Sequence, residues 1–192
     1  GLWGFGMHLE HEWVILTNLL MLLVGFALLA RHFEDSKVPA ILPRFLPDDW
    51  TGGLVLLVLI FVLSSFLDNI AAALIGGAIA HTVYKGKVHI GYLAAIVAAS
   101  NAGGSGSVVG DTTTTMMWIA GVAPLDVTHA YAAAVPALLI GGLIAAIQQH
   151  RYSPIMKDTH HRPHIDWTRV GIVAAILVVA ILIFGPKKLP EL

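Results

Sequence analysis

The chain has 192 residues, of which 57% are hydrophobic and 12% are charged, and its formal net charge is −1. Ordinary soluble domains carry about 25% charged residues, so this composition predicts an integral membrane protein. The balanced charge offers no basic surface for nucleic acid, and the lack of cysteine excludes disulfide scaffolds, thiol catalysis and cysteine-ligated metal sites.

The first apolar run covers residues 13–30. As a helix it would measure about 27 Å, which is enough to cross a bilayer, so we expect a span. The connector that follows, residues 31–51, contains three prolines and seven charged residues. This composition predicts an irregular segment at the membrane interface.

The second apolar run, residues 54–80, is interrupted by the polar sequence Ser64-Ser65-Phe66-Leu67-Asp68-Asn69. One straight helix of this length would measure about 40 Å, whereas the hydrocarbon core is about 30 Å thick. Each apolar half alone would measure only about 15 Å. A re-entrant hairpin that turns back at residues 64–69 therefore fits this run as well as a span does.

The placement of basic residues favours the hairpin. Lys and Arg lie in the connectors 31–51, 81–89 and 148–168, while the predicted loop 124–129 contains none. If the chain turns back at residues 64–69, all three basic connectors lie on one side, which the positive-inside rule makes cytoplasmic. Lys187 and Lys188 are the exception, because this topology places them outside.

The third apolar run, residues 90–123, is broken at its centre by glycine-rich sequence that ends at Asp111 and continues into four threonines. Such backbone at membrane depth leaves its polar groups unpaired unless it is buried in protein or lines a wet cavity. We therefore expect a broken helix beside a cavity. A span at residues 130–147 and a short one at 170–184 complete an all-α single membrane domain over residues 1–192.

Asp68 and Asp111 place carboxylates where hydrocarbon is expected, which makes both of them candidates for a functional site. Unwound carbonyls and Ser, Thr and Asn oxygens suit a hard cation such as sodium. Ionised carboxylates would repel an anion such as citrate, whereas a sodium ion and a proton would compete for the same oxygens. A purely structural role as helix N-caps is the alternative.

Two sequence segments carry a family resemblance. Residues 61–73, FVLSSFLDNIAAA, and residues 99–119, ASNAGGSGSVVGDTTTTMMWI, resemble the motifs in the first half of NhaD-type sodium/proton antiporters. These belong to the ion transporter superfamily, which also holds citrate and dicarboxylate carriers. The superfamily builds its site from two inverted repeats, each with a re-entrant hairpin and a broken helix. The resemblance implies that this chain is one repeat, a fragment whose partner is a missing second half or a second copy.

The resemblance also implies an ion site shared by the hairpin tip and the break. Its residues would be Ser65, Asp68, Asn69, Asn101, Asp111, Thr112, Thr113 and Thr114. They would bind a sodium ion and a proton in a bacterial inner membrane, with no cofactor, no transition-metal site and no catalytic residue. A citrate or dicarboxylate carrier of the same superfamily is one alternative. A non-transporting membrane subunit is another, since residues 184–192 resemble the hinge of the small pore subunit of the twin-arginine translocase.

Overall fold

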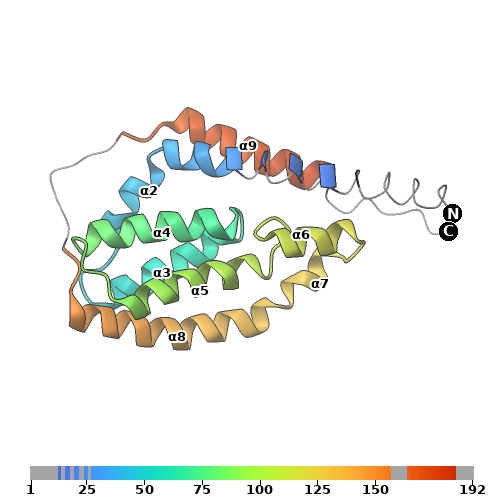
Figure 1. The fold of residues 1–192 in the computed structure, drawn as a ribbon. Coiled ribbons are helices and arrows are strands. Elements are labelled where there is room, and N and C mark those ends of the chain that lie inside the picture. Colours follow the sequence, from blue (N-terminus) through green and yellow to red (C-terminus); the bar gives the residue numbers. More distant parts are fainter. Residues whose placement is uncertain are drawn as a thin grey trace, which may run out of the picture.

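The computed structural model describes residues 13, 16–17, 20–21, 24–25, 27–156 and 164–184, and within them every regular element is a helix. The prediction of an all-helical chain is confirmed for these residues. Residues 27–35 are helical, and the elements after them are α2 (Val38–Ile41), η1 (Leu42–Phe45), α3 (Trp50–Ser64), α4 (Asn69–Val83), α5 (Ile90–Gly104), α6 (Thr112–Ile119), α7 (Pro124–Thr128), α8 (Tyr131–Tyr152) and α9 (Trp167–Phe184) (Figure 1).

The chain reverses direction between α3 and α4, at the polar residues that interrupt the second apolar run (Figure 1). Each helix has 15 residues and therefore measures about 22 Å. Asp68 ends the turn as the N-cap of α4, since its carboxylate accepts the backbone N–H groups of Ile70 and Ala71 at 3.1 and 3.4 Å. Asp49 caps α3 in the same manner. Helix α3 begins before the predicted run of residues 54–80, and α4 ends after it.

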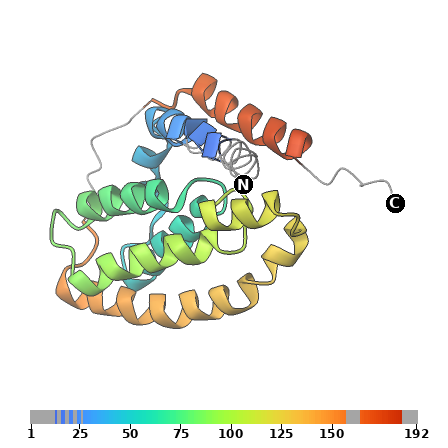
Figure 2. The same ribbon diagram turned by 45° about the vertical axis from the view of Figure 1, so that its right-hand side comes forward.

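Four helices, α3, α4, α5 and α8, enclose the hydrophobic core (Figures 1 and 2). The Tyr92 hydroxyl donates to the carbonyl of Gly53 at 2.6 Å, which places the start of α5 beside the start of α3. The Tyr131 hydroxyl lies 2.8 Å from Oγ of Ser65, which places the start of α8 beside the end of α3. Neighbouring helices along the chain therefore run in opposite directions.

The connecting ends of these helices are held by a buried glutamine. The side chain of Gln149 is fully buried, accepts the backbone N–H of His89 at 2.7 Å and donates to the carbonyls of Lys87 and Ser153 at 3.0 and 3.1 Å. The N–H of Met156 donates to the carbonyl at the end of α4 at 2.7 Å. The structure thus brings the connectors before α5 and after α8 together at one end of the helical group.

The third apolar run is broken at residues 105–111, as its glycine-rich sequence predicts, because α5 ends at Gly104 and α6 begins at Thr112. Most of the predicted loop at residues 124–129 forms the short helix α7, because Pro124 suits a first helical position. Among the described residues, Pro124–Tyr152 is the one stretch long and apolar enough to cross a membrane. Within this stretch, α8 has 22 residues and measures about 33 Å.

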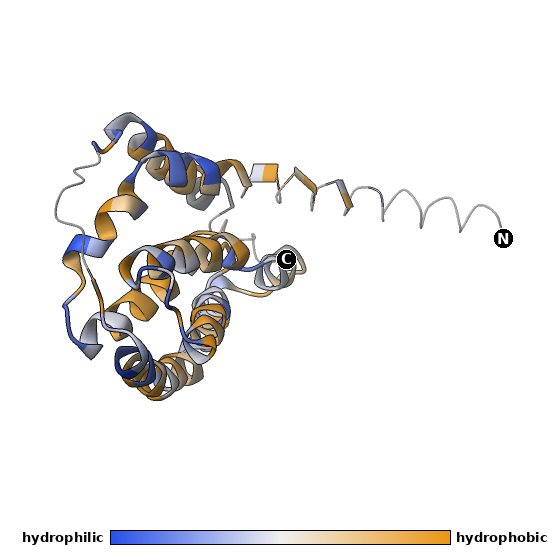
Figure 3. Cartoon of the chain, turned by 60° about the vertical axis from the view of Figure 1, so that its left-hand side comes forward, coloured by the Kyte–Doolittle hydropathy of each residue, from blue (hydrophilic) through white to orange (hydrophobic). Residues whose placement is uncertain are grey.

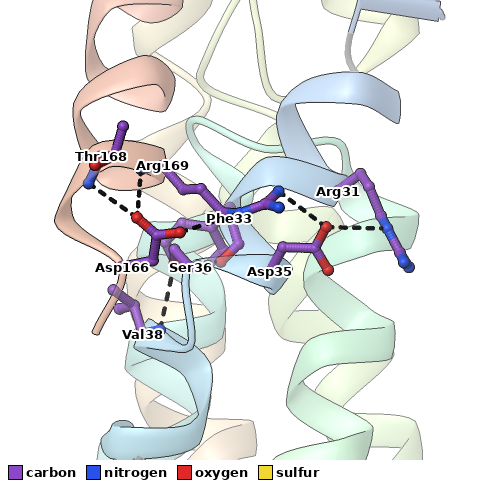
Figure 4. Close-up of polar contacts among 8 residues, drawn as sticks. All are labelled: Arg31, Phe33, Asp35, Ser36, Val38, Asp166, Thr168 and Arg169. Atoms are coloured by element: carbon purple, nitrogen blue, oxygen red, sulfur yellow. Dashed lines mark hydrogen bonds and ion pairs between the residues drawn. The ribbon is translucent and has the colours of Figure 1, made fainter. Parts of the chain in front are cut away.

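Helix α9 lies beside the helical residues 27–35 (Figures 1 and 2). Asp35 accepts from Arg169 at 3.1 Å and pairs with Arg31 at 3.4 Å, while Asp166 pairs with Arg169 at 3.3 Å (Figure 4). The first helix continues to residue 35, within the predicted interfacial connector, and the pair of Arg31 and Asp35 lies one helical turn apart on it.

Apolar residues cover the helices, whereas polar residues gather at helix ends and connectors (Figure 3). The predicted short span at residues 170–184 corresponds to α9, which begins three residues earlier. The predicted span at residues 13–30 lies only partly within the described residues, and Lys187, Lys188 and the translocase-like segment lie outside them, except for residue 184.

Candidate ion-binding site

The tip of the hairpin, residues 65–69, packs against the break in the following helix. The side-chain amide of Asn69 donates to Oδ1 of Asn101 at 3.0 Å and to Oδ2 of Asp111 at 2.8 Å. Asn69 therefore joins the first motif to both polar positions of the second. The structure brings together three residues that the sequence predicts for one site.

Serine side chains from the hairpin satisfy the backbone at the end of α5. The Ser64 hydroxyl donates to the carbonyl of Ser100 at 2.5 Å, and the Ser65 hydroxyl donates to that of Gly103 at 3.1 Å. The carbonyl of Gly103 is among the last four of α5, and carbonyls at a helix end are costly in an apolar surrounding when they have no partner. These contacts explain how α5 ends within the protein, and they give Ser65 a place in the predicted site.

The hairpin and the break touch at glycines. A side chain at Gly103 would place its Cβ 2.0 Å from the carbonyl oxygen of Phe61, and one at Gly110 would place it 2.2 Å from that of Ser64. Only the missing side chain permits this approach, which is the way small residues bring membrane helices together. The geometry of the site thus depends on backbone contact.

Asp68 and Asp111 are the N-caps of α4 and α6, and Asp111 accepts the backbone N–H of Thr113 at 2.6 Å. A helix N-terminus carries partial positive charge, so both carboxylates lie where negative charge is stabilised. Asp68, Asn69 and Asp111 are partly buried, while Asn101 is exposed. Asp111 belongs to the polar cluster with Asn69 and Asn101, which remains open at its edge, whereas among the described residues Asp68 bonds only to the start of α4.

The four threonines after Asp111 differ in their surroundings. The hydroxyls of Thr114 and Thr115 are buried and donate to the carbonyls of Ser107 and Val108 at 2.5 and 2.6 Å. These two residues hold the loop of the break against the start of α6. The sequence alone did not indicate Thr115 for this role. Thr112 is partly buried and Thr113 is exposed at the start of α6.

Tyr131 contacts the site although the sequence did not indicate it. Its hydroxyl lies 2.8 Å from Oγ of Ser65 and 3.0 Å from the carbonyl oxygen of Gly103, and its ring centroid lies 5.5 Å from that of Phe61. Tyrosine is common near the ends of membrane spans. Nothing in the local sequence therefore distinguishes this tyrosine from an interfacial one.

The sequence also matches a known protein family. A family model described as citrate transporter matches residues 8–192. This chain belongs to the citrate transporter family. Membership confirms the predicted ion transporter superfamily and identifies an integral membrane protein with the character of a secondary carrier. No curated protein and no solved structure gives a significant match.

Proposed function

We propose that this family member exchanges sodium ions for protons across the membrane, and that Asp68 and Asp111 are the carboxylates at which the two cations compete. The contact of Asn69 with Asn101 and Asp111 carries this proposal, because it joins the polar centres of both motifs in one cluster. Hard cations prefer oxygen ligands, and side-chain oxygens of Ser65, Thr112 and Thr113 add to the carboxylates. Thr114 contributes by holding the loop.

The capping pattern favours a cation over an anion. Free N–H groups at a helix N-terminus make a ready anion site. Here Asp68 accepts two N–H groups at the start of α4 and Asp111 accepts one at the start of α6. The chain itself already supplies the negative charge that a carboxylate substrate would bring. An incoming anion would also meet repulsion from both aspartates.

Helix lengths bear on the membrane arrangement. Helices α3 and α4 have 15 residues each and measure about 22 Å, which is shorter than the hydrocarbon core of about 30 Å, whereas α8 has 22 residues. We propose that α3 and α4 form a re-entrant hairpin that reaches the midplane of a bacterial inner membrane, with the basic connectors in the cytoplasm. A second inverted repeat, from a second half or a second copy, would complete the site.

The description of the family favours a second candidate, transport of citrate. The two candidates separate in proteoliposomes that contain the protein. Sodium/proton exchange predicts that an imposed sodium gradient changes the internal pH, whereas citrate transport predicts saturable uptake of labelled citrate. Citrate uptake without any sodium-driven pH change would replace the first candidate with the second.

A matched pair of variants tests the role of the carboxylate. Asp111→Asn keeps an N-cap residue of similar strength but removes the charge, so the sodium-driven pH change should fall to background. Asp49→Asn is the control, because Asp49 caps α3 with the same contact to the second following N–H, at 3.0 Å, and is exposed. Equal exchange in both variants would show that the aspartates only cap helices. Asp68→Asn should behave like Asp111→Asn.

A further inference from the structure

Tyr131 is the first residue of α8, yet its hydroxyl reaches the contact between the hairpin and the break. The hydroxyl donates to Oγ of Ser65 at 2.8 Å, and the Ser65 hydroxyl in turn donates to the carbonyl of Gly103 at 3.1 Å. The Tyr131 oxygen lies 3.0 Å from the same carbonyl. Three helices, α3, α5 and α8, thus meet in one chain of hydrogen bonds.

The ring of Tyr131 is also held in place, by packing contacts. It packs against the ring of Phe61 with a centroid distance of 5.5 Å and a tilt of 49°. On its other side, a Cβ atom at Gly106 would lie 2.5 Å from the ring, so a side chain there would displace it. The break therefore provides a space for this ring, and the orientation of the hydroxyl follows from the packing.

Ser65 is itself one of the proposed ion ligands, and both Ser65 and Gly103 lie within a few residues of the others. Ser65 precedes Asp68 and Asn69 in the turn, and Gly103 follows Asn101 at the end of α5. A shift of the turn against α5 would change the separation of the two halves of the site. The Tyr131 hydroxyl lies within hydrogen-bonding distance of both sides of this junction, with its one proton directed to Ser65.

We propose that Tyr131 is a positioning residue for the ion site, whose hydroxyl fixes the hairpin tip against the broken helix and ties both to the long stretch Pro124–Tyr152. The transport part of this inference rests on the proposed function. The positioning part does not, because it concerns the distance between two elements of the chain. Two measurements address these parts separately.

The first measurement uses Tyr131→Phe, which keeps the ring and removes the hydroxyl. Loss of one hydrogen bond from the bound state should raise the sodium concentration for half-maximal exchange roughly fivefold, with the maximal rate less affected. Tyr92→Phe is the matched control, since Tyr92 also donates to a helix carbonyl, that of Gly53 at 2.6 Å, at the opposite end of the helical group. Its sodium dependence should equal that of the wild type.

The second measurement needs no transported ion. The chain has no cysteine, so spin labels can be attached at Phe66→Cys and Met116→Cys, which replace exposed residues of the tip and of α6. The distance distribution between the labels should be narrow in the parent and in Tyr92→Phe, and broader in Tyr131→Phe. Equal widths in all three proteins would overturn the positioning role.

The possible outcomes distinguish the proposed sodium/proton exchange from the positioning role of Tyr131. Absence of sodium-driven exchange in the wild type would count against the proposed function, while a broadened distribution in Tyr131→Phe would still support positioning. Exchange in the wild type, with the same sodium dependence and the same label distances in both tyrosine variants, would overturn the role of Tyr131 and leave the proposed function standing.

Discussion

The two ends of the group α3, α4, α5 and α8 are both joined by polar contacts, but the chemistry of these contacts differs. At the connector end, neutral groups meet: Gln149 and Tyr92 are fully buried and bond to backbone groups. At the tip end, Asn69 and Asp111 are partly buried and bond to side chains. A neutral network sealed from solvent is typical of structural support, whereas a charged and reachable one is typical of a functional site.

This contrast associates the connector end with structural support and the tip end with the proposed transport site. Buried neutral groups that are fully bonded stabilise one arrangement of the helices. The carboxylates of Asp68 and Asp111 at the tip end cap helices, and in the proposed function the same groups also bind the cation. Variants that change one end and not the other can therefore separate stability from transport.

The largest expected effect is at the glycine contact of the tip end. Gly103→Ala forces a Cβ against the backbone of Phe61, so the free energy of unfolding in detergent should fall by about 3 kcal/mol. Gly77→Ala is the control, because nothing lies within 4 Å of a Cβ at that helical position. Alanine is also the better helix former, so this control should be neutral or slightly stabilising. Similar losses in both variants would contradict the close contact.

The next effect is at the connector end. Gln149→Leu leaves the N–H of His89 and the carbonyl of Lys87 without partners, which should cost about 2 kcal/mol of unfolding free energy. The exposed neighbour in Gln148→Leu should change stability by less than about 0.5 kcal/mol. The sodium concentration for half-maximal exchange should be unchanged in both. A large shift in Gln149→Leu would show that the two ends are not independent.

A smaller effect is expected for one hydrogen bond at the tip. Ser64 is fully buried, and Ser64→Ala leaves the carbonyl of Ser100 without this donor, so thermal unfolding should report a loss of about 1 kcal/mol. Thr82→Ala removes a similar bond, from Thr82 to the carbonyl of Ala78, on the exposed surface of α4. That control should have little effect, and equal losses would argue against burial as the cause.

The smallest effect concerns Asp49, the N-cap of α3 outside the candidate site. The Thr51 hydroxyl donates to Asp49 and lowers the pKa of this exposed carboxyl from its ordinary value of 3.8. Because the folded state holds the proton less tightly, the contribution of Asp49 to stability is present above pH 3.8 and is lost as the pH falls through the lowered pKa. Thr51→Val should return the pKa toward its ordinary value, as a carboxyl NMR titration can measure. An unchanged titration would contradict this cause.

The sequence predicted the positions of the turn and the break because a polar residue in apolar sequence has a local signature. Asp68 is a good N-cap beside a residue that tolerates a turn, and the closely spaced glycines before Asp111 disfavour a continuous helix. Element boundaries were less accurate. The helical segments α2, η1 and α7 each have a proline at their first or second position, and composition alone counts such a proline as a break.

Residues at both ends show where local sequence stops being informative. Nothing near Gln149 distinguishes it from its exposed neighbour Gln148, and nothing near Tyr131 distinguishes it from an interfacial tyrosine. Gln149 bonds to His89, which lies 60 residues away along the chain, and Tyr131 bonds to Ser65, which lies 66 residues away. Burial and partner choice at such distances depend on how the helices pack.

By itself, the sequence determined that this protein is helical, apolar and interrupted by two polar segments, because each of these properties follows from nearby residues. Only the tertiary structure decided that Asn69 bonds to Asn101 and Asp111, that Gly103 meets the backbone of Phe61, and that Tyr131 joins the junction. The physical reason is that close packing selects among many polar and small residues of the same local character, and only those that face one another become a site.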